Sequence, residues 1–388
     1  MKKRILSLGL LLVSLIANAQ TKIFIPRYVK MPKDSLVKSQ IITDLNSFLI
    51  ETKKENTLNK YVLPSQKVET YILADEFKGV EKMRSNKHFF KPYLNNIVKI
   101  DSNKYLVQIS HIGIKDSIPY LRTMYNLIAH HRNNSFLFSS PLIENTKRWK
   151  TKIIKNFTFK YKDTLNIEKA LKYVSLANEF DEKLKSHNKK TILYCAKNRT
   201  ELLGLIGVEY KLDYNGRSTG TFSALNGNEQ LIVLGNNNEK FDNFDPHDLW
   251  HDRLSLVKSR RKVNKHVDEA CAYLYGGSWG LSWDEVFNLF MQRVISDKKN
   301  IDWMYYKENR SNFADTQAEH LMVDYVVTAL IVKKIEKEKG FEGVWKLLNS
   351  GKYEKGNEKY FKVLDEMIGI NKKNYNKEVW KLIKKENK

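Results

Sequence analysis

Apolar residues first recur at helical spacing along this chain and later alternate with polar ones. Residues 34–54 carry apolar side chains three and four positions apart, which predicts a helix, and residues 67–87 favour a second helix. From about residue 94 the period becomes two, which is typical of half-buried strands. The strands are expected at residues 97–100, 105–113, 120–131, 135–140 and 152–162.

The second half of the chain returns to helical spacing. A strongly periodic helix is expected at 166–186, followed by a strand at 190–196 and extended segments at 207–214 and 219–236. From residue 245 onward the pattern is almost entirely helical.

These patterns predict an α+β protein of two domains. Residues 20–164 combine helices with an antiparallel meander, so this region resembles small α+β domains of the cystatin-like or NTF2-like type. Residues 165–388 are expected to form a second domain with a helix, a small sheet and then a helical half. A chain of 388 residues is long enough for two separate cores.

The composition is that of a folded protein with excess positive charge. The chain is 42% hydrophobic and has only 7 Pro, which excludes collagen-like, low-complexity and wholly disordered classes. The net charge of +23 is spread along the sequence and accompanies no nucleic-acid-binding motif, so we expect no nucleic-acid partner. Cys195 and Cys271 are too few for a disulfide framework, and we expect them to remain unpaired.

The first 19 residues are typical of a secretory signal peptide. Basic residues 2–4 precede an apolar run over 5–16, and the Ala-Asn-Ala sequence at 17–19 provides a cleavage site. The run is short for a membrane span, so a membrane anchor is the lesser alternative, and no later stretch reaches 18 uninterrupted apolar residues. We therefore expect a periplasmic or secreted protein with no transmembrane segment after the signal peptide is removed.

A candidate metal site begins at Asp245. An Asp followed by Pro246 predicts a helix start, because Asp is a favoured N-cap and Pro is favoured in the first helical position. His247 and His251 are then four residues apart. This spacing places both imidazoles on one face of the helix, where they can bind the same metal ion.

A third ligand is expected from a second helix at 263–275. The first helix continues beyond His251 to a basic loop at 258–262, and Glu269 lies a similar distance along the second helix, level with the histidines. Asp268 points about 100° away and is less suitable. Two histidines and one carboxylate leave a fourth position open for water, as in catalytic zinc sites.

The two segments resemble the zinc site of gluzincin metallopeptidases. HDLWH at 247–251 and DEACAYLY at 268–275 are similar to the HExxH and downstream E-G-x-A motifs of that family. The resemblance implies that His247, His251 and Glu269 hold a Zn²⁺ ion and that the protein hydrolyses peptide bonds.

The resemblance extends beyond the motif. The strand and helix expected at 191–207, the strand at 230–235 and the helices of the C-terminal region follow the order found in peptidase MA-like domains. The match covers roughly residues 165–388. It implies a zincin-like fold for the second domain.

One position departs from the family motif. The residue after the first histidine is the general base of the family and is a glutamate there, whereas this chain has Asp248. Aspartate is one methylene group shorter, and a general base must lie within hydrogen-bond reach of the proton that it removes. Asp248 also has a purely structural interpretation, because the helix dipole stabilises an acid in the first turn.

Further residues are candidates for supporting roles. His320 and Tyr325 lie where the resemblance implies an oxyanion-stabilising histidine or tyrosine. His320 could instead be a surface or capping residue, and Tyr325 a core residue, because apolar residues surround it at helical spacing. His266 would share the helix face of Glu269, so it is a candidate for supporting the ligands or for replacing one of them. Trp279 and Trp283 could line a cleft or pack in the core.

Three functional hypotheses follow. The first is a periplasmic or secreted zinc-dependent hydrolase that acts on a peptide or protein substrate, with Asp248 as base. The second is a catalytically impaired pseudo-peptidase that serves as a binding or assembly module in the cell envelope. The third is a basic protein that binds envelope polyanions. Retention of all three ligand residues favours the first hypothesis.

Overall fold

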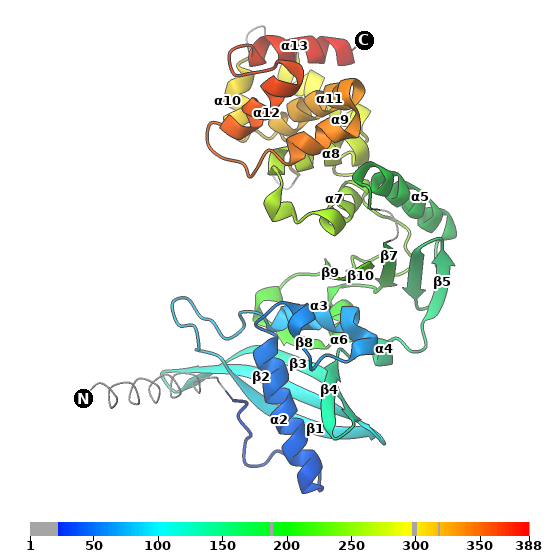
Figure 1. Ribbon diagram of the computed structural model, residues 1–388, viewed down its shortest axis with the longest axis vertical. Coiled ribbons are helices and arrows are strands. Elements are labelled where there is room, and N and C mark those ends of the chain that lie inside the picture. Colours follow the sequence, from blue (N-terminus) through cyan, green and yellow to red (C-terminus); the bar gives the residue numbers. More distant parts are fainter. Residues whose placement is uncertain (1–21, 187–188, 297–300, 317–318, 388) are drawn as a thin grey trace, which may run out of the picture. The chain divides into compact units, whose positions relative to one another are not determined.

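The computed structural model describes residues 22–186, 189–296, 301–316 and 319–387 (Figure 1). The signal peptide expected at residues 1–19 lies outside them. The described chain is a mixed α/β protein with two five-stranded sheets. It forms two compact units. The first contains the described residues up to Leu165 and Lys189–Phe241, and the second contains those of Asn166–Asn188 and Asp242–Lys388.

The first sheet is the antiparallel meander that the alternating pattern predicts. Its strands are β1 (Lys91–Asp101), β2 (Lys104–Lys115), β3 (Ile118–Arg132), β4 (Ser135–Ser139) and β8 (Val208–Lys211). Strands β1 to β4 pair in sequence order, and β8 pairs with β3. Alternate residues such as Val107, Ile109 and Tyr125 are fully buried on one face, because successive side chains of a strand point to opposite sides.

The second sheet has the order β5-β6-β7-β10-β9. Its strands are β5 (Lys150–Ile154), β6 (Phe157–Tyr161), β7 (Lys190–Cys195), β9 (Gly220–Asn226) and β10 (Glu229–Gly235). Strand β7 pairs in parallel with β6 and β10, and the two outer pairs are antiparallel. The single strand predicted at 152–162 is wrong, because a turn in which Lys155 has a φ of 52° divides it into the β5–β6 hairpin.

Two helices complete the core of the first unit (Figure 1). Helix α2 (Ser35–Glu51) begins after Asp34, whose side chain accepts hydrogen bonds from two backbone N–H groups. Helix α3 (Lys67–Phe77) packs against strands of both sheets, so one hydrophobic core serves both. The helix predicted at 67–87 is shorter than expected and ends at Phe77. Gly79 then adopts a φ of 76°, which is not helical and which glycine adopts readily. The remaining helices of this unit are α4 (Leu142–Asn145) and α6 (Arg199–Ile206).

The second unit is helical and is built around α11 (Val323–Leu348). The other helices are α5 (Ile167–Leu184), α7 (Pro246–Val257), α8 (Lys265–Gly276), α9 (Trp283–Phe290), α10 (Trp303–Glu308), α12 (Glu358–Ile368) and α13 (Tyr375–Glu386). Helix α11 packs against α8, α9, α10, α12 and α13, while α5 packs against α7. Gly340 interrupts α11 with a φ of 66°, which bends the helix.

The units divide the chain differently from the single boundary expected at residue 165. The strand expected at 190–196 is β7, and its hydrogen bonds join it to β6, which precedes that boundary. The small sheet expected in the second domain therefore belongs to the first unit. Helix α5 alone passes into the helical unit before the chain returns to the sheet.

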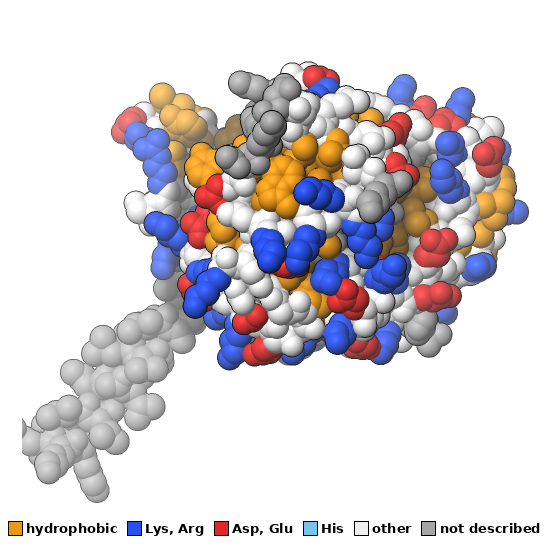
Figure 2. Space-filling view, turned by 90° about the horizontal axis from the view of Figure 1, so that it is seen from above, with side chains coloured by type: hydrophobic (Ala, Val, Ile, Leu, Met, Phe, Trp, Pro, Cys, Tyr) orange, Lys and Arg blue, Asp and Glu red, His pale blue; other side chains and the backbone are white. Residues whose placement is uncertain are grey.

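Other expectations from the composition can be compared with the structure. Cys195 and Cys271 are buried and unpaired, as predicted. None of the described helices is long and apolar enough to cross a membrane. On the face drawn in Figure 2, Lys and Arg side chains lie scattered among acidic and uncharged residues. The excess positive charge on this face is therefore distributed and not gathered into one block.

The first sheet contains buried histidines that make its stability depend on pH. His111 is 5% exposed, and its Nδ1 lies 3.1 Å from the Thr123 hydroxyl. Burial, aided by the positive charge of Lys53, lowers the pKa of His111 to about 4. His130 is also buried, and burial lowers its pKa to about 4 as well.

We expect the first unit to lose stability as the pH falls from about 6.5 to about 4. In that window an unfolded histidine binds a proton that the folded His111 does not bind. The free energy of unfolding of the wild type should therefore fall by on the order of 1–3 kcal/mol more than that of His111→Gln. Urea unfolding at several pH values, followed by hydrogen exchange in β2 and β3, measures this difference. His88→Gln, at an exposed position, is the control. The same pH dependence in the wild type and His111→Gln would contradict the expectation.

Candidate metal centre

Helix α7 carries the two histidines of the predicted site. The Asp245 carboxylate caps the helix by accepting a hydrogen bond from the His247 backbone N–H at 2.9 Å, and Pro246 follows it, as predicted. His247 and His251 lie one turn apart. Their Nε2 atoms are 3.2 Å from each other, so both rings face the same point.

Helix α8 brings Glu269 to that point. Its Oε2 atom lies 3.5 Å from Nε2 of His247 and 3.6 Å from Nε2 of His251. The ligand set predicted from the sequence is therefore brought together on two adjacent helices, in a group that could hold a metal ion.

The separations of these atoms fit a small tetrahedral ion. Zinc binds imidazole nitrogen and carboxylate oxygen at about 2.0–2.1 Å, so two tetrahedral ligands lie about 3.3–3.4 Å apart. The observed separations of 3.2, 3.5 and 3.6 Å are close to this value on all sides of the triangle. The three side chains have the spacing needed for one ion to bind them without rearranging the helices.

The other nitrogen of each histidine has a fixed partner. Nδ1 of His251 lies 2.8 Å from Oδ1 of Asp268, and Nδ1 of His247 lies 2.9 Å from the Gly277 carbonyl oxygen. A carboxylate and a carbonyl can only accept, so each Nδ1 carries a proton and Nε2 is the atom left for a metal. Partners of this kind orient metal-binding histidines.

Asp268 and Arg260 support the site and were not assigned to it from the sequence. Asp268 is 1% exposed and also accepts hydrogen bonds from Trp250 Nε1 at 3.2 Å and from Arg260 Nε at 2.7 Å. Arg260 further donates from Nη2 to Oε1 of Glu269 at 3.0 Å, which leaves Oε2 facing the histidines. The sequence predicts a loop at 258–262, whereas Arg260–Lys262 form a short 3₁₀ turn beside the ligands.

The charges of the ligands depend on one another. Burial lowers the pKa of His251, but hydrogen bonds to Asp268 and Glu269 outweigh it and raise this pKa to about 9. Burial raises the pKa of Glu269, but the His247 and His251 rings outweigh it and hold the pKa well below its usual range. The cluster is thus anionic at the carboxylate, and a metal ion would replace a proton on His251.

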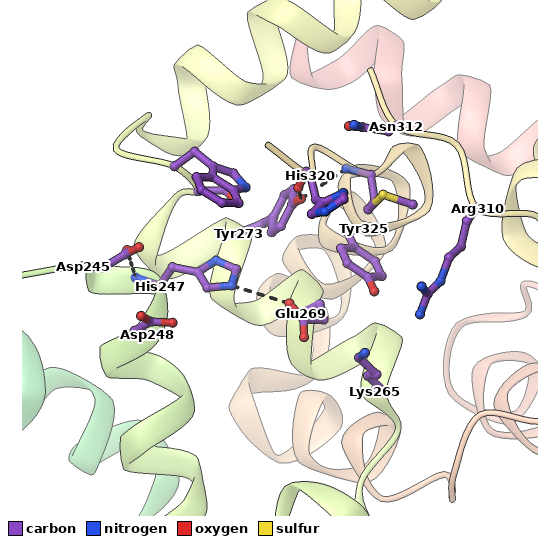
Figure 3. A pocket seen from close by; sticks show the side chains of 13 residues that line it. Asp245, His247, Asp248, Lys265, Glu269, Tyr273, Arg310, Asn312, His320 and Tyr325 are labelled. Atoms are coloured by element: carbon purple, nitrogen blue, oxygen red, sulfur yellow. Dashed lines mark hydrogen bonds and ion pairs between the residues drawn. The ribbon is translucent and has the colours of Figure 1, made fainter. Parts of the chain in front are cut away.

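The cluster lines a cavity of about 620 Å³ (Figure 3). This volume falls in the range of about 300–1,000 Å³ typical of ligand cavities. The residues that line the cavity are Asp245, His247, Asp248, Lys265, Glu269, Tyr273, Ser278, Trp279, Arg310, Asn312, His320, Met322 and Tyr325.

Asp248 lies in the first turn of α7 and lines the cavity with an exposed carboxylate. None of the described residues donates a hydrogen bond to that carboxylate. Its position agrees with both interpretations made from the sequence, since the same side chain faces the cavity and lies at the positive end of the helix.

Tyr325 and His320 line the opposite wall (Figure 3). Tyr325 lies in α11 and is half-buried, and its ring makes an edge contact with Tyr273. His320 is exposed and precedes α11 by three residues. Its backbone oxygen accepts a hydrogen bond from the Tyr273 hydroxyl at 2.8 Å, and this hydroxyl also accepts one from Met322 at 3.1 Å. The Tyr273 hydroxyl is therefore already engaged in hydrogen bonds with the wall of the cavity.

His266 does not join the ligand cluster. Its Nδ1 pairs with Asp324, and its ring stacks on Tyr353 with 4.3 Å between the centroids. Of the two tryptophans considered for a cleft, Trp279 lines the cavity. Trp283 packs on Phe287 and belongs to the core.

Comparisons with known protein families, with curated proteins and with solved structures found no match for this chain. What the centre does is therefore inferred from its own geometry. The strongest geometric observation is the triangle of ligand atoms at the edge of a cavity.

We expect the chain to bind about one divalent ion and Asp268→Asn to bind it about 10- to 100-fold more weakly. The asparagine cannot hold the His251 ring as a carboxylate does. Metal content by mass spectrometry and affinity by chelator competition measure both effects. The control is Asp284→Asn, an exposed aspartate in the first turn of α9. Undiminished metal binding by a His247→Ala, His251→Ala double variant would contradict the assignment.

Proposed function

We propose that this protein is a zinc-dependent metallopeptidase of the gluzincin type. The observation that carries the proposal is the convergence of His247, His251 and Glu269 at tetrahedral spacing beside a cavity. Three protein ligands with a cavity beside them are the mark of a catalytic zinc site, since structural zinc sites have four protein ligands.

Zinc is the metal that suits this set of ligands. Two imidazoles and a carboxylate are common zinc ligands, whereas magnesium and calcium prefer oxygen ligands alone. The separations of the ligand atoms agree with tetrahedral coordination. A bound zinc ion would polarise the scissile carbonyl group and lower the pKa of a water molecule.

In this proposal Asp248 acts as the general base. Its carboxylate lines the cavity beside His247 and has no hydrogen bond from any described residue, so it is available to a water molecule. After accepting a proton from the water, it would pass the proton to the leaving amine. Because the aspartate side chain is shorter, the water must lie closer to α7 than it would if this residue were a glutamate.

Tyr325 is the better candidate for stabilising the oxyanion. Burial, together with the charge of Glu269, raises the pKa of Tyr325, so the hydroxyl keeps its proton at neutral pH. The hydroxyl is directed into the cavity and donates to no described residue (Figure 3). His320 is exposed, so it is held less firmly than Tyr325.

The remaining expectations form part of the same proposal. The sequence of residues 1–19 supports export to the periplasm or beyond, where the substrate would be a peptide or protein. The meander with α2 supports a cystatin-like or NTF2-like accessory role for the first unit. The helices that carry the ligands support the helical part of a zincin-like domain, whereas the strands that the resemblance includes belong to the first unit.

A specific contact favours the alternative of a catalytically impaired pseudo-peptidase. Nη2 of Arg260 lies 3.3 Å from Nε2 of His251 and 3.0 Å from Glu269. A guanidinium ion here balances the carboxylate charge even when no metal is bound. The same unit would then serve as a binding or assembly module in the cell envelope. Turnover of peptides by zinc-loaded protein separates the two functions.

We expect Asp248→Asn to retain zinc and to lose peptide hydrolysis by about 10²- to 10⁴-fold, because an amide cannot accept the proton. Asp248→Glu restores the longer side chain and should preserve or raise turnover. Hydrolysis of a fluorogenic peptide library, with zinc content measured in parallel, tests this expectation. Asp284→Asn is again the control for the change in helix-end charge. Equal hydrolysis by wild type and Asp248→Asn would refute the role of base, and no hydrolysis by zinc-loaded wild type would favour the pseudo-peptidase.

Tyr325→Phe should lower kcat by about 10²- to 10³-fold with little change in KM, because the lost hydrogen bond forms in the transition state. Its thermal stability should match that of the wild type, since the hydroxyl bonds to no described residue. Steady-state kinetics and calorimetry measure the two quantities. Tyr305→Phe, at an exposed position of α10 outside the cavity, is the control. An unchanged kcat in Tyr325→Phe would remove this residue from the mechanism.

A further inference from the structure

The cavity beside the ligands carries opposite charges at its two ends. Asp245 and Asp248 come from the start of α7, whereas Lys265 comes from the start of α8 and Arg310 from the segment after α10. Figure 3 shows the aspartates on one side of Glu269 and the two cations on the other. A peptide bound across the cluster would therefore meet an acidic and a basic wall.

Both cations are free to bind a ligand. Neither Lys265 nor Arg310 forms an ion pair with a described Asp or Glu, and both are exposed. Arg260 differs, because its guanidinium is committed to Asp268 and Glu269. Lys265 is also unfavourable for its own helix, since the dipole disfavours a cation in the first turn. The stability of α8 therefore does not account for this lysine.

The two cations of the basic end suit one kind of ligand group. An arginine and a lysine together match a carboxylate, which accepts several charge-assisted hydrogen bonds at once.

We propose that Lys265 and Arg310 form a subsite for a carboxylate group of the bound peptide. The substrates would then be peptides with an acidic side chain, or with a free C-terminus, a short distance from the scissile bond. This assignment of the substrate class rests on the proposed peptidase function. The subsite would make the protein selective for acidic peptides, whereas the ligand cluster alone does not discriminate among peptides.

The test is the binding of matched peptides by the whole protein, with and without zinc. One series consists of capped hexapeptides in which a single Glu occupies each position in turn, and a second has Gln at the same positions. A third repeats the Gln peptides with a free C-terminal carboxylate. Isothermal titration calorimetry at about 0.15 M salt measures the affinities under conditions that screen unspecific attraction.

We expect at least one acidic peptide to bind roughly tenfold more tightly than its Gln counterpart. This is the lower end of the range for charge-assisted hydrogen bonds, because the subsite is open to solvent. The Glu and free C-terminus series identify which carboxylate is recognised. Lys265→Gln and Arg310→Gln should each remove most of the preference. Lys362→Gln and Arg217→Gln make the same charge change at exposed positions outside the cavity and should keep it.

The outcomes separate this proposal from the proposed function. Equal affinity for acidic and neutral peptides, no detectable binding of either, or an equal loss of preference in the control variants would overturn the subsite, even if the protein hydrolyses peptides. A preference that depends on Lys265 and Arg310 supports the subsite, even if zinc-loaded protein hydrolyses none of the peptides. In that case the peptidase fails and the acidic-peptide site remains.

Discussion

The geometry of the metal centre depends on the buried carboxylate of Asp268. This side chain lies on α8 and accepts hydrogen bonds from Trp250 and His251 of α7 and from Arg260 of the turn between the helices. A carboxylate that is 1% exposed is tolerated only when such donors replace its lost hydration. A shift of α7 along α8 would leave the charge unsatisfied, so the same contacts fix His251 opposite Glu269.

A second buried charge holds the opposite wall of the cavity. Asp324, in the first turn of α11, forms an ion pair with the fully buried Lys307 at 3.0 Å and accepts a hydrogen bond from His266. These contacts join the start of α11 to α8 and α10. Tyr325 follows Asp324 directly, so the position of its ring depends on this pair. Both walls of the cavity are therefore held by buried carboxylates outside it.

The sequence predicted the parts of the site that follow from local rules. Asp245 and Pro246 mark a helix start, and the spacing of His247 and His251 decides which helix face they share. The roles of Asp268 and Arg260 were missed, because they depend on how the 258–262 turn folds back on α8. The hydrophobic periodicity also predicts a protein that mixes helices and sheets. It does not predict the parallel pairing of β7 with β6, because periodicity does not identify a distant partner strand. Zinc, catalysis and export stay predictions.

The path of the chain between the units has a consequence for biosynthesis. Helix α5 is made before strands β7, β9 and β10, but α7, the helix that it packs against, comes after them. Since Leu184 ends α5 and Pro246 begins α7, a ribosome adding about 5–20 residues per second begins α7 roughly 3–12 seconds after it completes α5. During that time its apolar face, which includes Tyr173, Val174 and Phe180, stays uncovered. The nascent chain thus passes through a stage in which the strands of the first unit are complete but the apolar face of α5 is still exposed. At this stage α5 is the segment most prone to non-native association.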